Sequence, residues 1–141
     1  RPAGFDSALI VRGVEGGVIP SLRQVGKAVA YQDKGEEAEY EINPEAMGIQ
    51  QTVRAVPLPG DLPKTERDDE IAIMVDVKAT AEAAAEAGMA ALCGNKGATY
   101  DSLVLGAAMV LHHVGRARTL AEAADMARAA LDSGKAAKRV K

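Results

Sequence analysis

The chain has few aromatic residues and a single cysteine. Of its 141 residues one is phenylalanine, three are tyrosine and none is tryptophan, although 48% are apolar. Alanine supplies much of the apolar content, so we expect closely packed backbones where bulky side chains would otherwise fill the core. Cys93 cannot form an internal disulfide by itself, which excludes a disulfide-stapled secreted scaffold and favours a reducing, cytoplasmic location.

The chain also lacks a net positive charge and a long apolar run. Its formal charge of −3 argues against strong nonspecific attraction of the whole chain to nucleic acid or anionic membrane. No apolar run approaches the roughly 18 residues of a membrane span, and the start at Arg1 is not a signal peptide. Because Arg1 is not a methionine, we expect further polypeptide upstream in the intact protein.

The remaining pattern predicts one α/β domain over residues 1–141. Ser7 to Arg12, a short apolar run between glycines, predicts a buried central strand. Ala28 to Tyr31 and Ala38 to Ile42 flank Gly35 and predict a β-hairpin.

A short helix and a long connection follow. Asn43 as cap and Pro44 at the first helical position predict a helix of one or two turns that ends at Gly48. The prolines and glycine between residues 51 and 76 predict an extended connection, with a possible short strand over Glu70 to Val75.

Three helices are predicted in the C-terminal half. Apolar spacings of three and four predict the first over Val77 to Cys93, capped by Asp76. Tyr100 to Val114, capped by Thr99, is apolar almost all round, which is typical of a buried helix. Thr119 and Glu122 form a capping box that opens the third, which runs to about Ser133. We expect close backbone contacts at the two helical glycines, Gly88 and Gly106.

The glycine-rich turn after the first strand is the best candidate site, because backbone N–H groups at the carboxyl end of a strand often bind ligands in α/β sheets. Its spacing matches no dinucleotide or P-loop fingerprint, so a plain tight turn is the alternative. Glu15 could contact a metal or a ribose hydroxyl, and Ser21 and Arg23 could contact phosphate. The candidates are Arg12, Gly13, Glu15, Gly16, Gly17, Ser21 and Arg23.

Other reactive side chains are assigned structural roles. His112 and His113 are adjacent on a helix and point about 100° apart, so they do not share one metal easily, and packing or surface roles are favoured. Cys93, at the end of a predicted helix, lacks the cationic surroundings typical of a reactive thiolate, so a buried structural role is favoured. Arg116 and Arg118 suit the end of a helix. The alternative is a polyanion-binding patch that they form with Lys135, Lys138, Arg139 and Lys141.

Several separate blocks of the sequence resemble one family. Leu9 to Gly17 is similar to a strand and glycine turn, Glu41 to Ile49 to an acidic E-I-D-P-E-x-x-G-L segment, and Ala91 to Leu111 to a helix, a glycine break and a buried helix. Thr119 to Ala136 is similar to the final helices. Together they resemble the C-terminal part of anthranilate phosphoribosyltransferase, within the glycosyltransferase family that includes pyrimidine nucleoside phosphorylases.

The resemblance implies transfer of a phosphoribosyl group from phosphoribosyl diphosphate to an aromatic amine or base, with magnesium, as in tryptophan biosynthesis. It implies a homodimer whose subunit has a small helical domain and a large α/β domain, of which this chain is the C-terminal portion. The upstream diphosphate loop has no counterpart here. The fragment alone is therefore expected to be inactive, with the N-terminal remainder of the protein as its partner.

Three departures from the family concern the site. Where the family has an Asp-Glu pair that binds magnesium, this chain has Val18, Ile19 and Pro20. The family's histidine before the turn is Arg12, and an asparagine of the buried helix is Gly106. This pattern is similar to divergent relatives that bind nucleic acid, so a non-catalytic nucleic-acid-binding or regulatory role is the alternative function.

Overall fold

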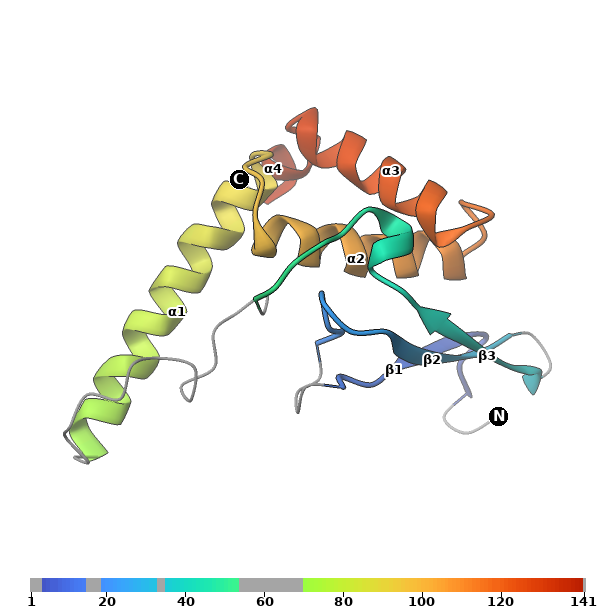
Figure 1. The fold of residues 1–141 in the computed structure, drawn as a ribbon, viewed down its shortest axis with the longest axis horizontal. Helices are drawn as coiled ribbons and strands as arrows, with labels where there is room; N and C mark the ends of the chain where they lie inside the picture. Colours follow the sequence, from blue (N-terminus) through green and yellow to red (C-terminus); the bar gives the residue numbers. More distant parts are fainter. Residues whose placement is uncertain (1–3, 15–18, 33–34, 54–69, 141) are drawn as a thin grey trace.

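The computed structural model describes residues 4–14, 19–32, 35–53 and 70–140; at positions 70–77 and 80 it describes the backbone only. Its elements form a small sheet followed by helices (Figure 1). The fold class predicted from the sequence, α/β with a strand and a β-hairpin followed by packed helices, is confirmed.

The sheet has three antiparallel strands in the order β1-β2-β3. They are β1 (Ala8–Val11), β2 (Gly26–Tyr31) and β3 (Glu37–Ile42). The predicted hairpin is confirmed: Ala30 pairs with Ala38, and Gly35 takes a φ of +79° in the connection. β1 is an edge strand rather than the predicted central one, because β2 returns antiparallel to it and β3 pairs on the far side of β2. Ile10, at its centre, is 56% exposed.

A short 3-10 helix, η3 (Glu45–Met47), follows the sheet. It begins one residue later than predicted, because Pro44 and not Asn43 is the N-cap, although Asn43 Oδ1 accepts a hydrogen bond from Glu45 N at 3.1 Å. The predicted end at Gly48 is confirmed, with a φ of +72°. Of the predicted extended connection, residues 54–69 lie outside the described residues, and residues 70–76 are helical.

The part of the chain that the structure describes has four α-helices after η3: α1 (Glu70–Leu92), α2 (Ala98–His113), α3 (Leu120–Asp132) and α4 (Lys135–Val140). α2 lies over one face of the sheet and α3 lies over α2, while α1 projects away from both (Figure 1). None of the helices within the described residues is long and apolar enough to cross a membrane.

The core lies between the sheet, η3, α2 and α3. Ile42, Met47 and, from α2, Val104 and Leu105 belong to one core cluster, and all are at most 2% exposed. Small side chains fill the space between α2 and α3. They are Ala108, Ala123, Ala124 and Ala127. The expected close backbone packing is therefore found between these two helices.

Several local predictions for the helices are wrong. The run over Glu70 to Val75 belongs to α1 and not to a strand, so Asp76 lies inside the helix and does not cap it. Short apolar runs suit either structure, and here the helix simply continues. Gly97, not Thr99, is the N-cap of α2. A Cβ on Gly88 or Gly106 would meet nothing within 4 Å, so close contact does not explain these glycines.

Of the two hydrogen bonds of the predicted capping box of α3, the first is confirmed. Thr119 Oγ1 accepts a hydrogen bond from Glu122 N at 3.1 Å. The Glu122 carboxylate accepts from Arg118 N, one residue before the position that a reciprocal box uses. Gly134 ends the helix with a φ of +70°, and the basic tail that follows forms α4.

Candidate functional site

A cavity of about 170 Å³ opens between the start of the sheet and the segment around η3. Two of its walls come from the segment before β2 and from the turn into η3, and the third is the stretch without regular secondary structure that follows Gly48. Its lining residues are Leu22, Arg23, Gln24, Val25, Asn43, Pro44, Glu45, Ile49, Gln50 and Gln51. The cavity thus joins a predicted phosphate contact, Arg23, with the acidic segment that carries part of the family resemblance.

Ser21 shapes the first wall. Its side chain is buried, at 5% exposure, and its Oγ accepts hydrogen bonds from Arg23 N at 3.1 Å and from Gln24 N at 3.0 Å. A serine that binds the backbone two and three residues on fixes a tight turn. Ser21 therefore holds Arg23 and Gln24 in place, and its hydroxyl supports the cavity rather than lining it.

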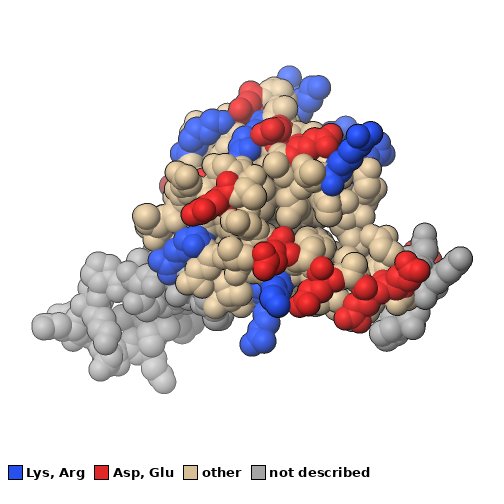
Figure 2. Space-filling model, turned by 45° about the vertical axis from the view of Figure 1, so that its right-hand side comes forward, with Lys and Arg blue, Asp and Glu red and all other residues tan. Residues whose placement is uncertain are grey.

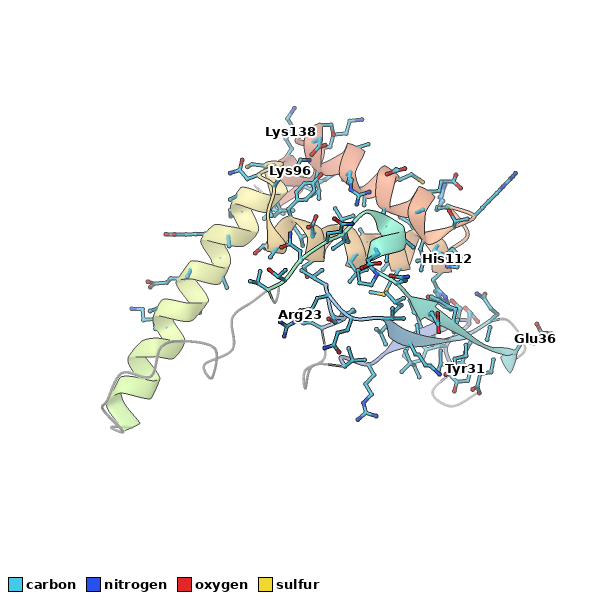
Figure 3. The ribbon with its side chains drawn as sticks, viewed as in Figure 1. Arg23, Tyr31, Glu36, Lys96, His112 and Lys138 are labelled. Atoms are coloured by element: carbon cyan, nitrogen blue, oxygen red, sulfur yellow. The ribbon has the colours of Figure 1, made fainter. Side chains whose placement is uncertain are left out.

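Arg23 connects two walls of the cavity. Its Nη1 donates to Thr52 O at 3.0 Å, across 29 residues of sequence, and its side chain is exposed at the rim (Figure 3). Gln51, on the same wall as Thr52, donates from Nε2 to Asp101 Oδ2 at 2.7 Å and so fixes this wall to α2. The rim is held from both the sheet and the helix layer.

The chemistry of the lining suits a small anionic or hydroxyl-rich group. A guanidinium and several amide side chains offer N–H donors of the kind that bind phosphate and sugar oxygens. At about 170 Å³ the cavity is well below the roughly 300 Å³ at which pockets for drug-sized ligands begin. One phosphate or one sugar would fill it, and a whole phosphoribosyl diphosphate would extend beyond it.

Of the other candidates from the glycine turn, the structure describes Arg12 and Gly13, and neither lines this cavity. Arg12 is exposed just after β1, and Gly13 is buried. Glu15, Gly16 and Gly17 lie outside the described residues. Since the sheet is antiparallel here, the rule that places ligands at the carboxyl ends of parallel strands does not apply to β1.

Val18, Ile19 and Pro20 stand where the family that the sequence resembles has its magnesium-binding Asp-Glu pair. Val18 is outside the described residues; Ile19 is 49% exposed and Pro20 half-buried. Among the residues that the structure describes, no group of three or more His, Cys, Asp or Glu side chains could hold a metal ion.

The histidines pack at the joint between α2 and the sheet. The His112 ring lies edge-on to Tyr40, with centroids 5.6 Å apart, and His113 Nε2 lies 3.3 Å from Ser7 Oγ. These contacts agree with the packing or surface roles predicted for both. Cys93 is exposed, so its predicted burial is wrong: it follows the last residue of α1, where the helix ends at the surface.

The predicted cationic patch divides into two groups. Arg116 and Arg118 precede α3, whereas Lys135, Lys138 and Arg139 follow it, and Lys141 lies outside the described residues. A helix of 13 residues is about 20 Å long, so α3 separates the groups by about that distance. The two sets do not form a single patch.

A search of protein-family models found none that matches this chain, and no curated protein matched it either.

Proposed function

We propose that this chain is part of a phosphoribosyltransferase-like protein and that the cavity beside Arg23 holds one phosphate or sugar moiety of its substrate. The observation that carries the proposal is the meeting of two distant segments. Arg23 and Gln24 line the same cavity as Asn43 and Glu45, from a block that resembles the family's acidic segment.

The electrostatics of the cavity support an anionic ligand near its rim. The exposed Arg23 guanidinium, on a residue that lines the cavity, is held by its hydrogen bond to Thr52 O, and hydrogen bonds between a guanidinium and phosphate are among the stronger ones in proteins. Glu45, on the opposite wall, suits a ribose hydroxyl better than a phosphate, since a carboxylate accepts hydrogen bonds and repels anions. A phosphorylated sugar satisfies both walls.

The small volume of the cavity supports a substrate site that this chain shares with the remainder of the protein. Because it holds only part of a phosphoribosyl diphosphate, the diphosphate and the aromatic acceptor require surface from the remainder of the protein. The proposed reaction forms a bond from the acceptor nitrogen to ribose C1 and breaks the bond from C1 to the diphosphate, which leaves. Magnesium, where present, would need ligands beyond Val18, Ile19 and Pro20.

Binding by this chain is tested with ribose 5-phosphate and phosphoribosyl diphosphate in amide NMR titrations. We expect millimolar binding with shifts confined to residues 22–25, 43–45 and 49–51. Gln50→Glu adds a negative charge at the cavity and should weaken binding about fivefold, as expected for about 1 kcal/mol between unit charges about 4 Å apart in water. Gln32→Glu, an exposed position at the end of β2, is the matched control and should leave binding unchanged.

Activity is tested on the intact protein, by diphosphate release from phosphoribosyl diphosphate with anthranilate and then with other aromatic amines and bases. Absence of turnover with all of them, together with absence of shifts at the cavity, would overturn the proposal. Binding of nucleic acid that weakens steeply with salt would favour the alternative function, although the separation of the cationic groups by α3 weighs against it.

A further inference from the structure

The two outer edges of the sheet differ in charge. Along β3, Glu37, Glu39 and Glu41 are exposed, and acidic side chains gather on the hairpin side of the molecule (Figure 2). Charged side chains on an edge strand are a common protection against pairing with another chain. β1, with the sequence A-L-I-V, has no charged residue, and in the part of the chain that the structure describes it pairs with β2 alone. Among the described residues, no strand pairs with its outer edge and no charged side chain of the strand protects it.

The side chains around β1 divide between two faces. Leu9 and Val11 pack against the core, and Ile10 points to the opposite face, 56% exposed. Arg12 follows β1 directly, and Asp6 lies in a bend just before it; both are exposed. The strand therefore carries an acid before its first residue and a base after its last, with apolar residues between them.

We propose that two copies of this chain pair antiparallel through their β1 edges, about a two-fold axis, with Leu9 of one copy opposite Leu9 of the other. The pairing joins two three-stranded sheets into one sheet of six strands. It places Ala8 opposite Ile10 on the outer face and brings Asp6 of each copy beside Arg12 of the other. Asp6 also makes an interaction within its own chain, so the cross-chain pair is an additional contact.

Other registers fit less well. A shift by one residue on one copy would place core-facing Leu9 opposite outward-facing Ile10, which mixes the two faces of the sheet. With Ile10 opposite Ile10, Arg12 would face Ala8; with Ala8 opposite Ala8, Asp6 would face Ile10. Only the register centred on Leu9 joins opposite charges at both ends of the strand, and cross-strand pairs of opposite charge are the favourable ones.

The interface is small, which determines the expected affinity. Stable protein interfaces bury about 1,200–2,000 Å², and strands of four residues provide much less, so we expect a dissociation constant in the micromolar to millimolar range. This pairing does not depend on the proposed function and uses a different surface from the helical domain that the family resemblance implies for dimerisation.

Sedimentation velocity of the 141-residue chain at concentrations up to about 1 mM tests the proposal. We expect a monomer–dimer equilibrium that Ile10→Lys shifts at least about tenfold toward monomer, since Lys on an edge strand opposes pairing. Val110→Lys replaces an equally exposed apolar residue, 58% against 56%, on α2 and should leave the equilibrium unchanged. A chain that stays monomeric, or a dimer that Ile10→Lys leaves intact, overturns the proposal.

A charge exchange tests the register. Asp6→Arg and Arg12→Asp should each weaken the dimer, because each places like charges together, and the double variant should restore it. Failure of the double variant to recover would reject the register centred on Leu9. Far-UV circular dichroism of each variant checks that the monomer remains folded.

Discussion

The two ends of α2 differ in whether the buried polar groups have hydrogen-bond partners. At its N-terminal end, Tyr100 is 2% exposed and its hydroxyl donates to Asp132 Oδ1 at 2.8 Å and accepts from Lys96 Nζ at 2.7 Å. At its C-terminal end, Tyr40 Oη and the Nδ1 atoms of His112 and His113 are buried without a hydrogen-bond partner among the described residues. Lys96 and His112 mark these two ends in Figure 3.

The difference indicates which joint of the molecule is held more firmly. Lys96 Nζ also lies 2.6 Å from Asp132 Oδ1, so three side chains from α2, α3 and the loop before α2 satisfy one another. A buried polar group costs free energy unless it is paired, and a paired one fixes its neighbours in position. We infer that hydrogen bonds tie α2 to α3, whereas among the described residues the side chain of Tyr40 packs against the His112 ring of α2 without a hydrogen bond from its hydroxyl.

The largest expected effect on stability is at the N-terminal end of α2, where the buried hydroxyl has partners. Tyr100→Phe removes both hydrogen bonds but keeps the ring, and should reduce the free energy of unfolding by about 0.5–1.5 kcal/mol, the net contribution of a typical hydrogen bond, because Lys96 and Asp132 are exposed and stay paired with each other. Urea denaturation measures the change. An unchanged midpoint would show that the hydroxyl contributes nothing to the joint.

The matching substitution at the other end should act in the opposite direction. Burial raises the pKa of the Tyr40 hydroxyl above 10.0, which reflects its loss of contact with water. Tyr40→Phe removes a buried hydroxyl that has no partner and should leave stability unchanged or raise it by up to about 1 kcal/mol. A loss of stability comparable to that of Tyr100→Phe would mean that a bound water pairs with Tyr40 in solution, and the contrast between the ends would fail.

The smallest effect concerns pH. The hydrogen bond from Lys96, then that from Tyr100, lowers the pKa of Asp132 below its usual 3.8. A lowered pKa in the folded state means that the carboxylate stabilises the fold above the usual value, and that this contribution is lost as the pH falls below 3.8. Asp132 is exposed, so salt reduces the effect.

Thermal unfolding between about pH 2 and about pH 6 checks this, since stability there depends on proton uptake. Asp132→Asn should flatten the acid side of the profile, and Lys96→Met, which removes the first cause of the shift, should have the same effect. If both variants kept the pH dependence of the original chain, the three-residue cluster would not be formed in solution.

Local sequence patterns predicted the helices and strands themselves better than they predicted which of these elements pack or pair with one another. Gly35 between two alternating runs predicts the hairpin, and Thr119 predicts the start of α3, because turn and cap chemistry depends on residues close in sequence. The edge position of β1 was missed, since the order of strands depends on pairing between segments about twenty residues apart, from Ala8 to Tyr31.

The cavity was predicted only in part for the same reason. Ser21 and Arg23 were predicted to contact phosphate from their position after the glycine turn, and Arg23 does line the cavity. Asn43 was interpreted as the helix cap, but Pro44 is the N-cap, and nothing near Asn43 in sequence indicates that it lines a cavity together with Gln24. The cluster of Lys96, Tyr100 and Asp132 was missed too, because Asp132 is 32 and 36 residues away from its partners.

The alanines between α2 and α3 have a consequence for how this fold tolerates mutation. Ala108, Ala123 and Ala124 are fully buried, at 0% exposure, and have almost no side chain to lose. Substitution by a smaller residue, the commonest way to damage a core, therefore has little side chain to remove at this interface. Substitution by a larger residue is the damaging change, since each added methylene must force the two backbones apart. Between these helices, we therefore expect evolution to select against larger residues and hardly at all against smaller ones.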